Sequence, residues 1–71
     1  MQNTRIMKRI VLTRNHKRYR IYETANRYVV SIDTSDVVLW DNWKRIGETR
    51  TLEDALSLIR SHSGSEIRSI D

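Results

Sequence analysis

Arginine and aromatic residues share one parity in the first half of the chain. Arg18, Arg20 and Tyr22 alternate with apolar or acidic residues over residues 18–23. In a strand, this spacing puts all three side chains on the same side. Such a surface can bind nucleic acid, because arginines neutralise phosphates and aromatic rings stack on bases. It can also bind a protein, because Tyr, Trp and Arg dominate the hot spots of protein interfaces.

We extend this surface to the segments that we expect beside residues 18–23, and to the polar turn that precedes them. The candidate binding residues are Arg14, Lys17, Arg18, Arg20, Tyr22, Arg27, Val29 and Trp40. In the expected strand register, three of them (Tyr22, Val29 and Trp40) form one cross-strand row.

Three readings of this surface stay open. In the first, it binds nucleic acid, and a basic N-terminal arm with Arg5, Lys8 and Arg9 extends it. In the second, it binds a protein partner or another copy of the chain, which would also add to a thin core. In the third, the surface is structural, and the first strand or the C-terminal segment with Ile67 and Ile70 covers it.

The charge of the chain is unevenly distributed. Residues 1–30 hold eight Lys or Arg side chains against one acid, whereas residues 31–71 hold five basic and eight acidic side chains. The two halves therefore carry +7 and −3, which gives the net charge of +4. This asymmetry favours a polyanion at the basic end, although the acidic half would tend to repel phosphate.

No pattern in the sequence indicates catalysis. His16 and His62 are far apart and have no neighbouring His or Cys, so we expect no metal site. Asp41 and Glu48 flank turns, where carboxylates are usually solvated, and the chain has no glycine-rich phosphate loop. With 71 residues the chain cannot enclose a sizeable ligand cavity. We therefore expect a non-enzymatic binding module without a small-molecule cofactor.

The elements that must position the candidate residues are short strands separated by polar turns. Alternating or β-branched segments predict strands over residues 6–13, 18–23, 27–33 and 37–41, with a further short strand over residues 44–50.

Turn lengths fix the register of these strands. A two-residue loop at residues 25–26 places Ile21 opposite Val30 and Tyr19 opposite Ile32. The same reasoning across residues 34–35 pairs Ile32 with Val37 and Val30 with Leu39. The predicted core face of the sheet is then Tyr19, Ile21, Tyr28, Val30, Ile32, Val37 and Leu39. On the other face, Arg18 lies opposite Asp33, where we expect a surface ion pair.

One amphipathic helix follows the strands. Thr51 is suited to the N-cap, with Asp54 three residues later, and Gly64 is suited to the C-terminal stop. The apolar residues Leu52, Ala55, Leu56 and Ile59 have helical spacing and must pack on the core face of the sheet.

The sequence therefore predicts an α+β domain of β-β-β-(β)-α order, in which a small antiparallel sheet of three to four strands packs on one C-terminal helix. We expect a flexible arm over residues 1–5, the domain over residues 6–64, and a tail over residues 65–71 that frays. Trp43 is expected in or just after a turn, packed against the end of the helix, and the alternative is that Trp40 and Trp43 together anchor a partner.

The strand order, followed by a helix that begins with the sequence TLEDAL at residues 51–56, is similar to the small three-stranded DNA-binding domains of the integrase N-terminal and AP2 type. The similarity covers residues 18–62. It implies a sheet face that enters a DNA groove, with Arg18, Arg20, Arg27 and Trp40 in contact. Because it consists of topology and one helix start, it assigns the chain to neither family.

Composition also bears on the compartment. The chain has no cysteine, which favours a reducing environment. Its longest apolar run, residues 37–40, is too short to span a bilayer, and no signal-peptide hydrophobic block follows the basic N-terminal residues. We therefore expect a cytoplasmic protein that binds a protein partner or another copy of itself through the candidate binding surface, with nucleic acid as the alternative, and no membrane association.

Overall fold

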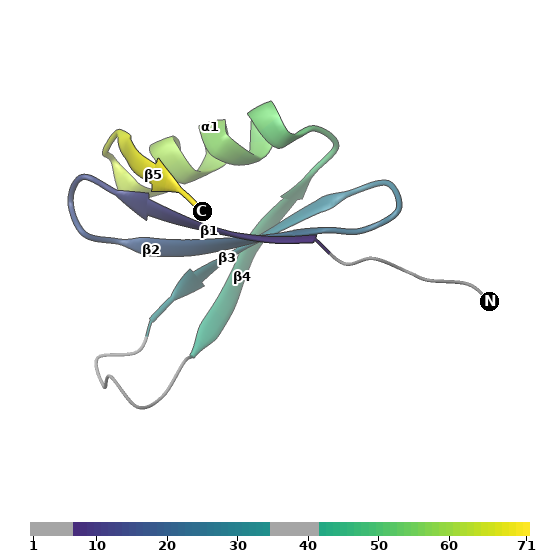
Figure 1. Ribbon diagram of the computed structural model, residues 1–71, viewed down its shortest axis with the longest axis horizontal. Helices are drawn as coiled ribbons and strands as arrows, with labels where there is room; N and C mark the ends of the chain where they lie inside the picture. Colours follow the sequence, from purple (N-terminus) through teal and green to yellow (C-terminus); the bar gives the residue numbers. More distant parts are fainter. Residues whose placement is uncertain (1–6, 35–41) are drawn as a thin grey trace.

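A computed structural model of the chain describes residues 7–34 and 42–71. Over these residues, five strands and one helix follow one another as β1 (Met7–Thr13), β2 (Arg18–Glu23), β3 (Tyr28–Asp33), β4 (Trp43–Thr49), α1 (Leu52–Ser63) and β5 (Ile67–Ile70). The strands form one antiparallel sheet in the order β4-β3-β2-β1-β5, and α1 covers one face of it (Figure 1). The predicted α+β fold is confirmed, with five strands in place of three to four.

The hairpin of β2 and β3 follows the predicted register. Ile21 pairs with Val30 and Tyr19 pairs with Ile32 across β2 and β3. The turn between these strands is closed by a backbone hydrogen bond of 2.8 Å from Thr24 N to Arg27 O. Parity therefore sends the arginines of β2 to the side away from these apolar residues.

The partner of β3 on its other edge differs from the prediction. Val30 pairs with Gly47 and Ile32 pairs with Lys44, so the expected pairing of β3 with Val37 and Leu39 is wrong. Both edges of β3 are taken, by β2 and β4. The predicted strand at residues 37–41 lies wholly outside the described residues.

Two features of β4 explain why alternation did not predict its pairing. The register shifts between Val30 and Ser31, so one residue of β4 is extra and the parity of the strand changes there. Gly47 lies where α1 approaches the sheet, and a Cβ atom at this position would be 3.0 Å from Leu58 Cδ2. A glycine weakens the strand signal in the sequence, yet here it makes room for the helix.

The helix has the predicted caps. The side chain of Thr51 accepts a hydrogen bond of 3.1 Å from Asp54 N. Gly64 adopts φ 71°, and its N–H donates to the carbonyl of Arg60. This left-handed conformation suits glycine and turns the chain back toward the sheet.

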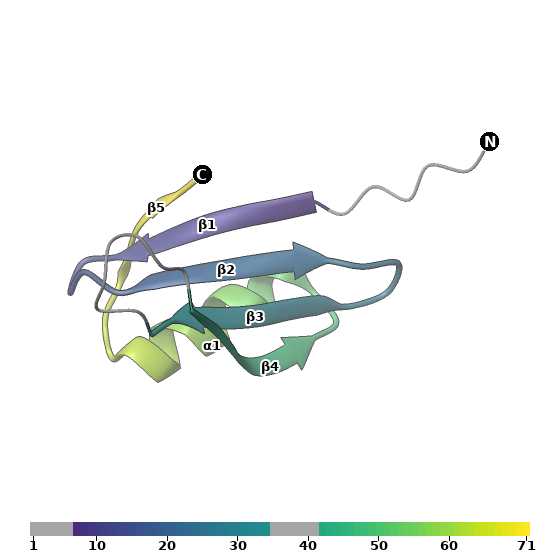
Figure 2. The same cartoon turned by 90° about the horizontal axis from the view of Figure 1, so that it is seen from below.

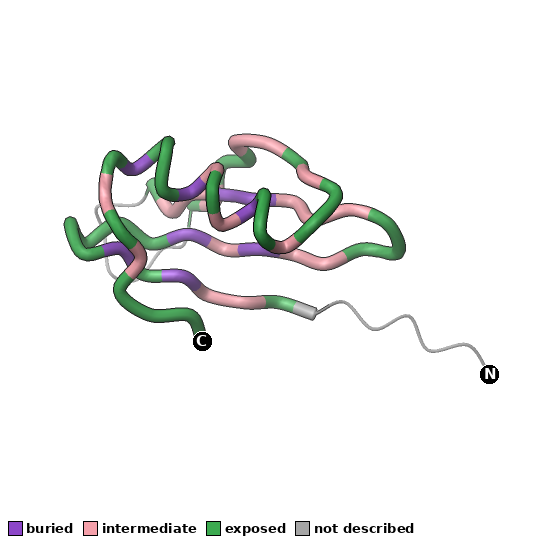
Figure 3. Tube along the Cα trace, turned by 90° about the horizontal axis from the view of Figure 1, so that it is seen from above, coloured by how far each residue is buried: buried purple, intermediate pink, exposed green. Residues whose placement is uncertain are grey.

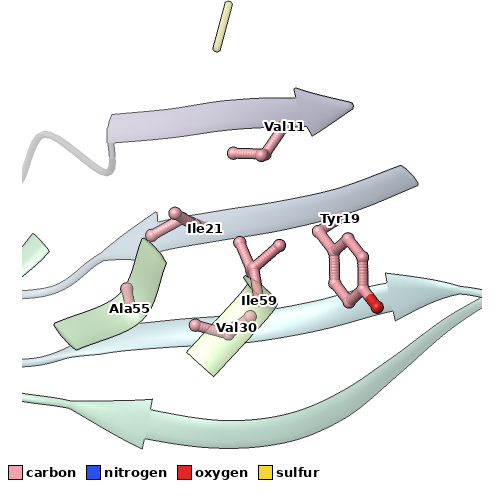
Figure 4. Close-up of a cluster of buried hydrophobic side chains, with 6 residues drawn as sticks. All are labelled: Val11, Tyr19, Ile21, Val30, Ala55 and Ile59. Atoms are coloured by element: carbon pink, nitrogen blue, oxygen red, sulfur yellow. The ribbon is translucent and has the colours of Figure 1, made fainter. Parts of the chain in front are cut away.

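The core between sheet and helix is small. Its buried apolar residues are Val11, Tyr19, Ile21, Val30, Ala55 and Ile59 (Figure 4). They come from the three central strands that face α1 and from the helix itself, while the turns and the outer side of α1 are exposed (Figure 3). In β1, Val11 enters the core, whereas its neighbour Leu12 faces away from it and is exposed.

The C-terminal segment does not form the expected tail. β5 pairs with β1, with Val11 opposite Ile70 and Thr13 opposite Ile67. Backbone hydrogen bonds from Arg14 N to Glu66 O and from Asp71 N to Ile10 O flank the pair. Without β5, the backbone N–H and C=O groups on the outer edge of β1 would have no strand partner. β5 pairs with part of this edge. The expected arm over residues 1–5 lies outside the described residues.

Candidate functional site

The sheet has an open face, which we define as the side that is turned away from α1. Figure 2 looks onto this face, with α1 behind the strands. No other described element lies against it, because β1 and β5 extend the sheet edge and do not cross the face. The side chains that strand pairing brings to this face are Lys8, Ile10, Leu12, Arg18, Arg20, Tyr22, Val29, Ser31, Asp33, Trp43, Arg45 and Glu48.

Arg20 occupies the centre of the open face. Its guanidinium carbon lies 4.3 Å from the ring centroid of Tyr22 and 4.5 Å from that of Trp43. Its pairing partner on β3, Ser31, is small and 5% exposed. The long side chains of Arg20, Tyr22 and Trp43 therefore meet beside the short side chain of Ser31. Their two rings and one guanidinium form a compact cluster, which we call the Tyr22–Arg20–Trp43 stack.

Arg18 lies beside this stack. Its Nη1 donates a hydrogen bond of 3.1 Å to Asp33 Oδ2, which confirms the predicted ion pair. Its guanidinium carbon is also 5.2 Å from the ring of Trp43. The side chain of Arg18 remains substantially exposed, so the pair itself adds little stability.

Glu48 lies within ion-pair distance of two arginines, Arg27 and Arg45. Arg45 Nη1 lies 3.1 Å from Glu48 Oε2, and Arg27 Nε lies 3.9 Å from Glu48 Oε1. Val29 pairs with Tyr22 on one side and with Glu48 on the other. The predicted Tyr22–Val29 contact across the strands is confirmed, but Glu48 takes the place that the sequence assigned to Trp40.

Two further candidates, Arg14 and Lys17, are not part of this cluster. Both are exposed in the loop between β1 and β2, at one end of the sheet. This loop is bonded to the segment after the helix, since Asn15 Nδ2 donates to Ser63 O at 2.9 Å. Trp40 lies outside the described residues.

Trp43 is the main functional candidate that sequence reasoning missed. It begins β4, pairs with Asp33, and faces the arginines of β2, whereas we expected it against the end of the helix. The sequence did contain a signal. A strand at residues 44–50, extended by one residue, puts Trp43 and Arg45 on one side by simple alternation.

The open face carries an excess of positive charge. Among the described residues that strand pairing brings to it, four are basic (Lys8, Arg18, Arg20 and Arg45) and two are acidic (Asp33 and Glu48), so their net charge is +2. Two copies that met through this face would bring like charges together, which is unfavourable. The face therefore matches an acidic partner better than it matches itself.

A separate polar contact lies on the helix side of the sheet. Tyr19 Oη is 2.8 Å from His62 Nδ1, and the two rings meet edge to face. Burial raises the pKa of the Tyr19 phenol, and a hydrogen bond with Ser63 partly opposes this shift. The contact joins β2 to the last turn of α1.

Residues 7–34 and 42–71 contain neither a candidate metal-ion site nor a membrane-spanning helix. In these ranges no three or more His, Cys, Asp or Glu side chains converge in a way that could hold a metal ion. The one described helix, α1, is neither long nor apolar enough to cross a membrane.

Comparison with known proteins gives no family. No protein-family model matches the chain, and no curated protein or solved structure matches it significantly. A functional assignment therefore rests on the residues of the open face.

Proposed function

We propose that the chain is a non-enzymatic binding module whose open face binds nucleic acid. One observation carries the proposal: a sheet face with net charge +2, which no described element covers, groups Tyr22 and Trp43 among arginines. Cations of this kind bind phosphates, and flat rings between them bind bases. The exposed loop cations Arg14 and Lys17 extend the positive potential at one end of the sheet.

The energies of base stacking and of phosphate contacts favour a ligand that uses both the aromatic rings and the cations of the open face. A stacked base contributes about 1–3 kcal/mol. Each phosphate contact releases counterions, so its contribution depends on salt. Ion pairs with Asp33 and Glu48 already hold three of the arginines of this region, so the expected affinity is modest. A cytoplasmic location is part of the proposal, and the cysteine-free composition supports it.

A protein partner is the second candidate. Tyr, Trp and Arg are the residue types that most often dominate protein interfaces, and the exposed Leu12 adds an apolar contact at the edge of the face. Because the face is basic, we expect such a partner to be acidic. Self-association through this face is disfavoured by the same charge.

The test measures the binding of fluorescein-labelled oligonucleotides of about a dozen nucleotides by fluorescence anisotropy. Single-stranded and duplex forms are titrated between about 50 mM and 200 mM salt. We expect binding at low salt that weakens steeply as salt increases. Lys8→Gln and Arg45→Gln should each reduce the slope of log K against log salt by about one.

Arg60→Gln on α1 is the matched control, because it removes the same charge from the other side of the molecule. It should leave the slope unchanged. The proposal is rejected if no oligonucleotide binds at low salt, or if Arg60→Gln acts as strongly as Lys8→Gln. Binding of an acidic polypeptide such as poly-glutamate in place of oligonucleotides, with the same response to the variants, would select the protein candidate.

A further inference from the structure

The Tyr22–Arg20–Trp43 stack has the form of a filled slot. Two rings, one from β2 and one from β4, lie within contact distance of the same planar guanidinium. The strand between them contributes the short side chain of Ser31 at the level of Arg20. A planar group of similar thickness could therefore contact both rings if Arg20 moved out.

Arg20 also has a buried donor atom, Nε, without a hydrogen-bond partner among the described residues. By contrast, Arg18, Arg27 and Arg45 each lie within ion-pair distance of an acid. A buried donor without an acceptor is unfavourable, so the stacked position of Arg20 carries a penalty that its release would remove.

We propose that Arg20 is a displaceable occupant of a base-binding slot between Tyr22 and Trp43, and that the open face therefore prefers single-stranded nucleic acid. This inference rests on the proposed function. A base that enters the slot gains stacking on two rings, which is stronger than an exposed cation–π contact. The released guanidinium gains charge-assisted hydrogen bonds to a phosphate of the same strand.

The preference for a single strand follows from the stacking. In a duplex, each base is already stacked on its neighbours and paired, so it cannot reach a slot on a protein surface without being flipped out. A single strand presents unstacked bases at little cost. A sheet face with one slot and cations around it therefore discriminates by strandedness and not by sequence.

Trp43 fluorescence tests the inference directly. Trp40→Phe leaves Trp43 as the one tryptophan, and circular dichroism checks that this variant keeps its fold. An unlabelled oligothymidylate is added, and in parallel the same strand annealed to its complement. We expect the single strand to quench Trp43 and to bind about tenfold more tightly than the duplex. The anisotropy assay on the unaltered chain gives the same ratio without relying on the background variant.

Variants of the slot separate stacking from charge. Tyr22→Leu and Trp43→Leu should each weaken single-strand binding by about tenfold and change duplex binding little. Tyr22→Phe keeps the ring and should bind like the unaltered chain. Arg20→Lys keeps the charge without the planar group, so we expect it to bind the single strand at least as tightly as the unaltered chain.

The outcomes distinguish this inference from the proposed function. Equal affinity for single strand and duplex, without quenching of Trp43, would overturn the slot but leave nucleic-acid binding in place. Arg20→Lys binding much more weakly than the unaltered chain would also overturn it, because Arg20 would then be a fixed contact. Absence of any binding at low salt would reject both.

Discussion

The phenolic oxygen of Tyr19 lies 2.8 Å from Nδ1 of His62, in a partly buried contact between β2 and the last turn of α1. Tyr19 has no exposed surface, and it is one of the largest side chains of the core. A buried hydroxyl needs hydrogen-bond partners, and His62 in the last turn of α1 is one of them, beside Ser63. The contact therefore fixes where the end of the helix sits on β2.

This contact gives an expectation for alkaline pH. Burial raises the pKa of Tyr19 above its usual value of 10.0. Above pH 10.0 the folded chain then holds the phenol proton more tightly than the unfolded chain, so the free energy of unfolding should decrease as pH increases. Urea unfolding near neutral pH and above pH 10 measures this difference. Tyr19→Phe should cost about 1 kcal/mol near neutral pH and should show a smaller decrease at alkaline pH.

The close approach of α1 to β4 predicts a second effect. A Cβ atom at Gly47 would be 3.0 Å from Leu58 Cδ2, so Gly47→Val should destabilise the fold by about 1–3 kcal/mol through overpacking. Shortening the opposing side chain tests this cause. In a Leu58→Ala background, Gly47→Val should cost measurably less, as determined by a double-mutant cycle in urea. Strictly additive costs would contradict the steric explanation.

The N-cap of α1 gives a third expectation. Thr51→Ala removes the oxygen that accepts from Asp54 N and should lower the free energy of unfolding by about 1 kcal/mol. Thr51→Asp keeps an acceptor at the cap and should restore most of this loss. Thermal unfolding followed by circular dichroism at 222 nm, the usual wavelength for helix, compares the variants. Equal destabilisation by both changes would show that capping is not the cause.

The loop between β1 and β2 gives a fourth expectation. Asn15 donates to the carbonyl of Ser63 and also accepts a hydrogen bond from Thr13 Oγ1, so it joins the hairpin to the end of the helix. Asn15→Ala should therefore destabilise the fold by about 1–2 kcal/mol. Asn26→Ala, in the exposed turn between β2 and β3, serves as the control and should change stability by less. Denaturant unfolding of the two variants decides between these roles.

Much of the fold followed from local patterns in the sequence. The pairing of Ile21 with Val30 required only strand parity and a short turn. The helix required a capping threonine, a helical apolar stripe and a terminal glycine, and these signals agree with one another. Such elements are predictable because neighbouring residues determine them.

The errors came from interactions that local patterns do not encode. Gly47 looks like a strand breaker, and its role becomes clear only when Leu58 packs over it. β5 is four residues long, and its pairing depends on β1, which is distant in sequence. Short apolar segments of this kind cannot be distinguished from a tail before the sheet edge is known.

The residues of the candidate site could be predicted where the register of their strands could be predicted. Parity placed Arg18, Arg20 and Tyr22 on one face, and pairing placed Asp33 beside Arg18. The stack around Arg20 was missed because residues 37–41, and not the strand that begins at Trp43, were expected beside residues 28–33. The functional hypothesis thus gained its central aromatic residue from tertiary structure.

The neighbouring positions of β1 and β5 also constrain the order in which the chain can fold. β1 can pair early with β2, but its outer partner comes from beyond the helix, so that ladder closes the longest loop of the fold. During synthesis, residues 7–13 must wait until residues 67–70 have left the ribosome. In that interval the outer edge of β1 is available to another nascent chain, and rapid production at high concentration should favour misassembly there.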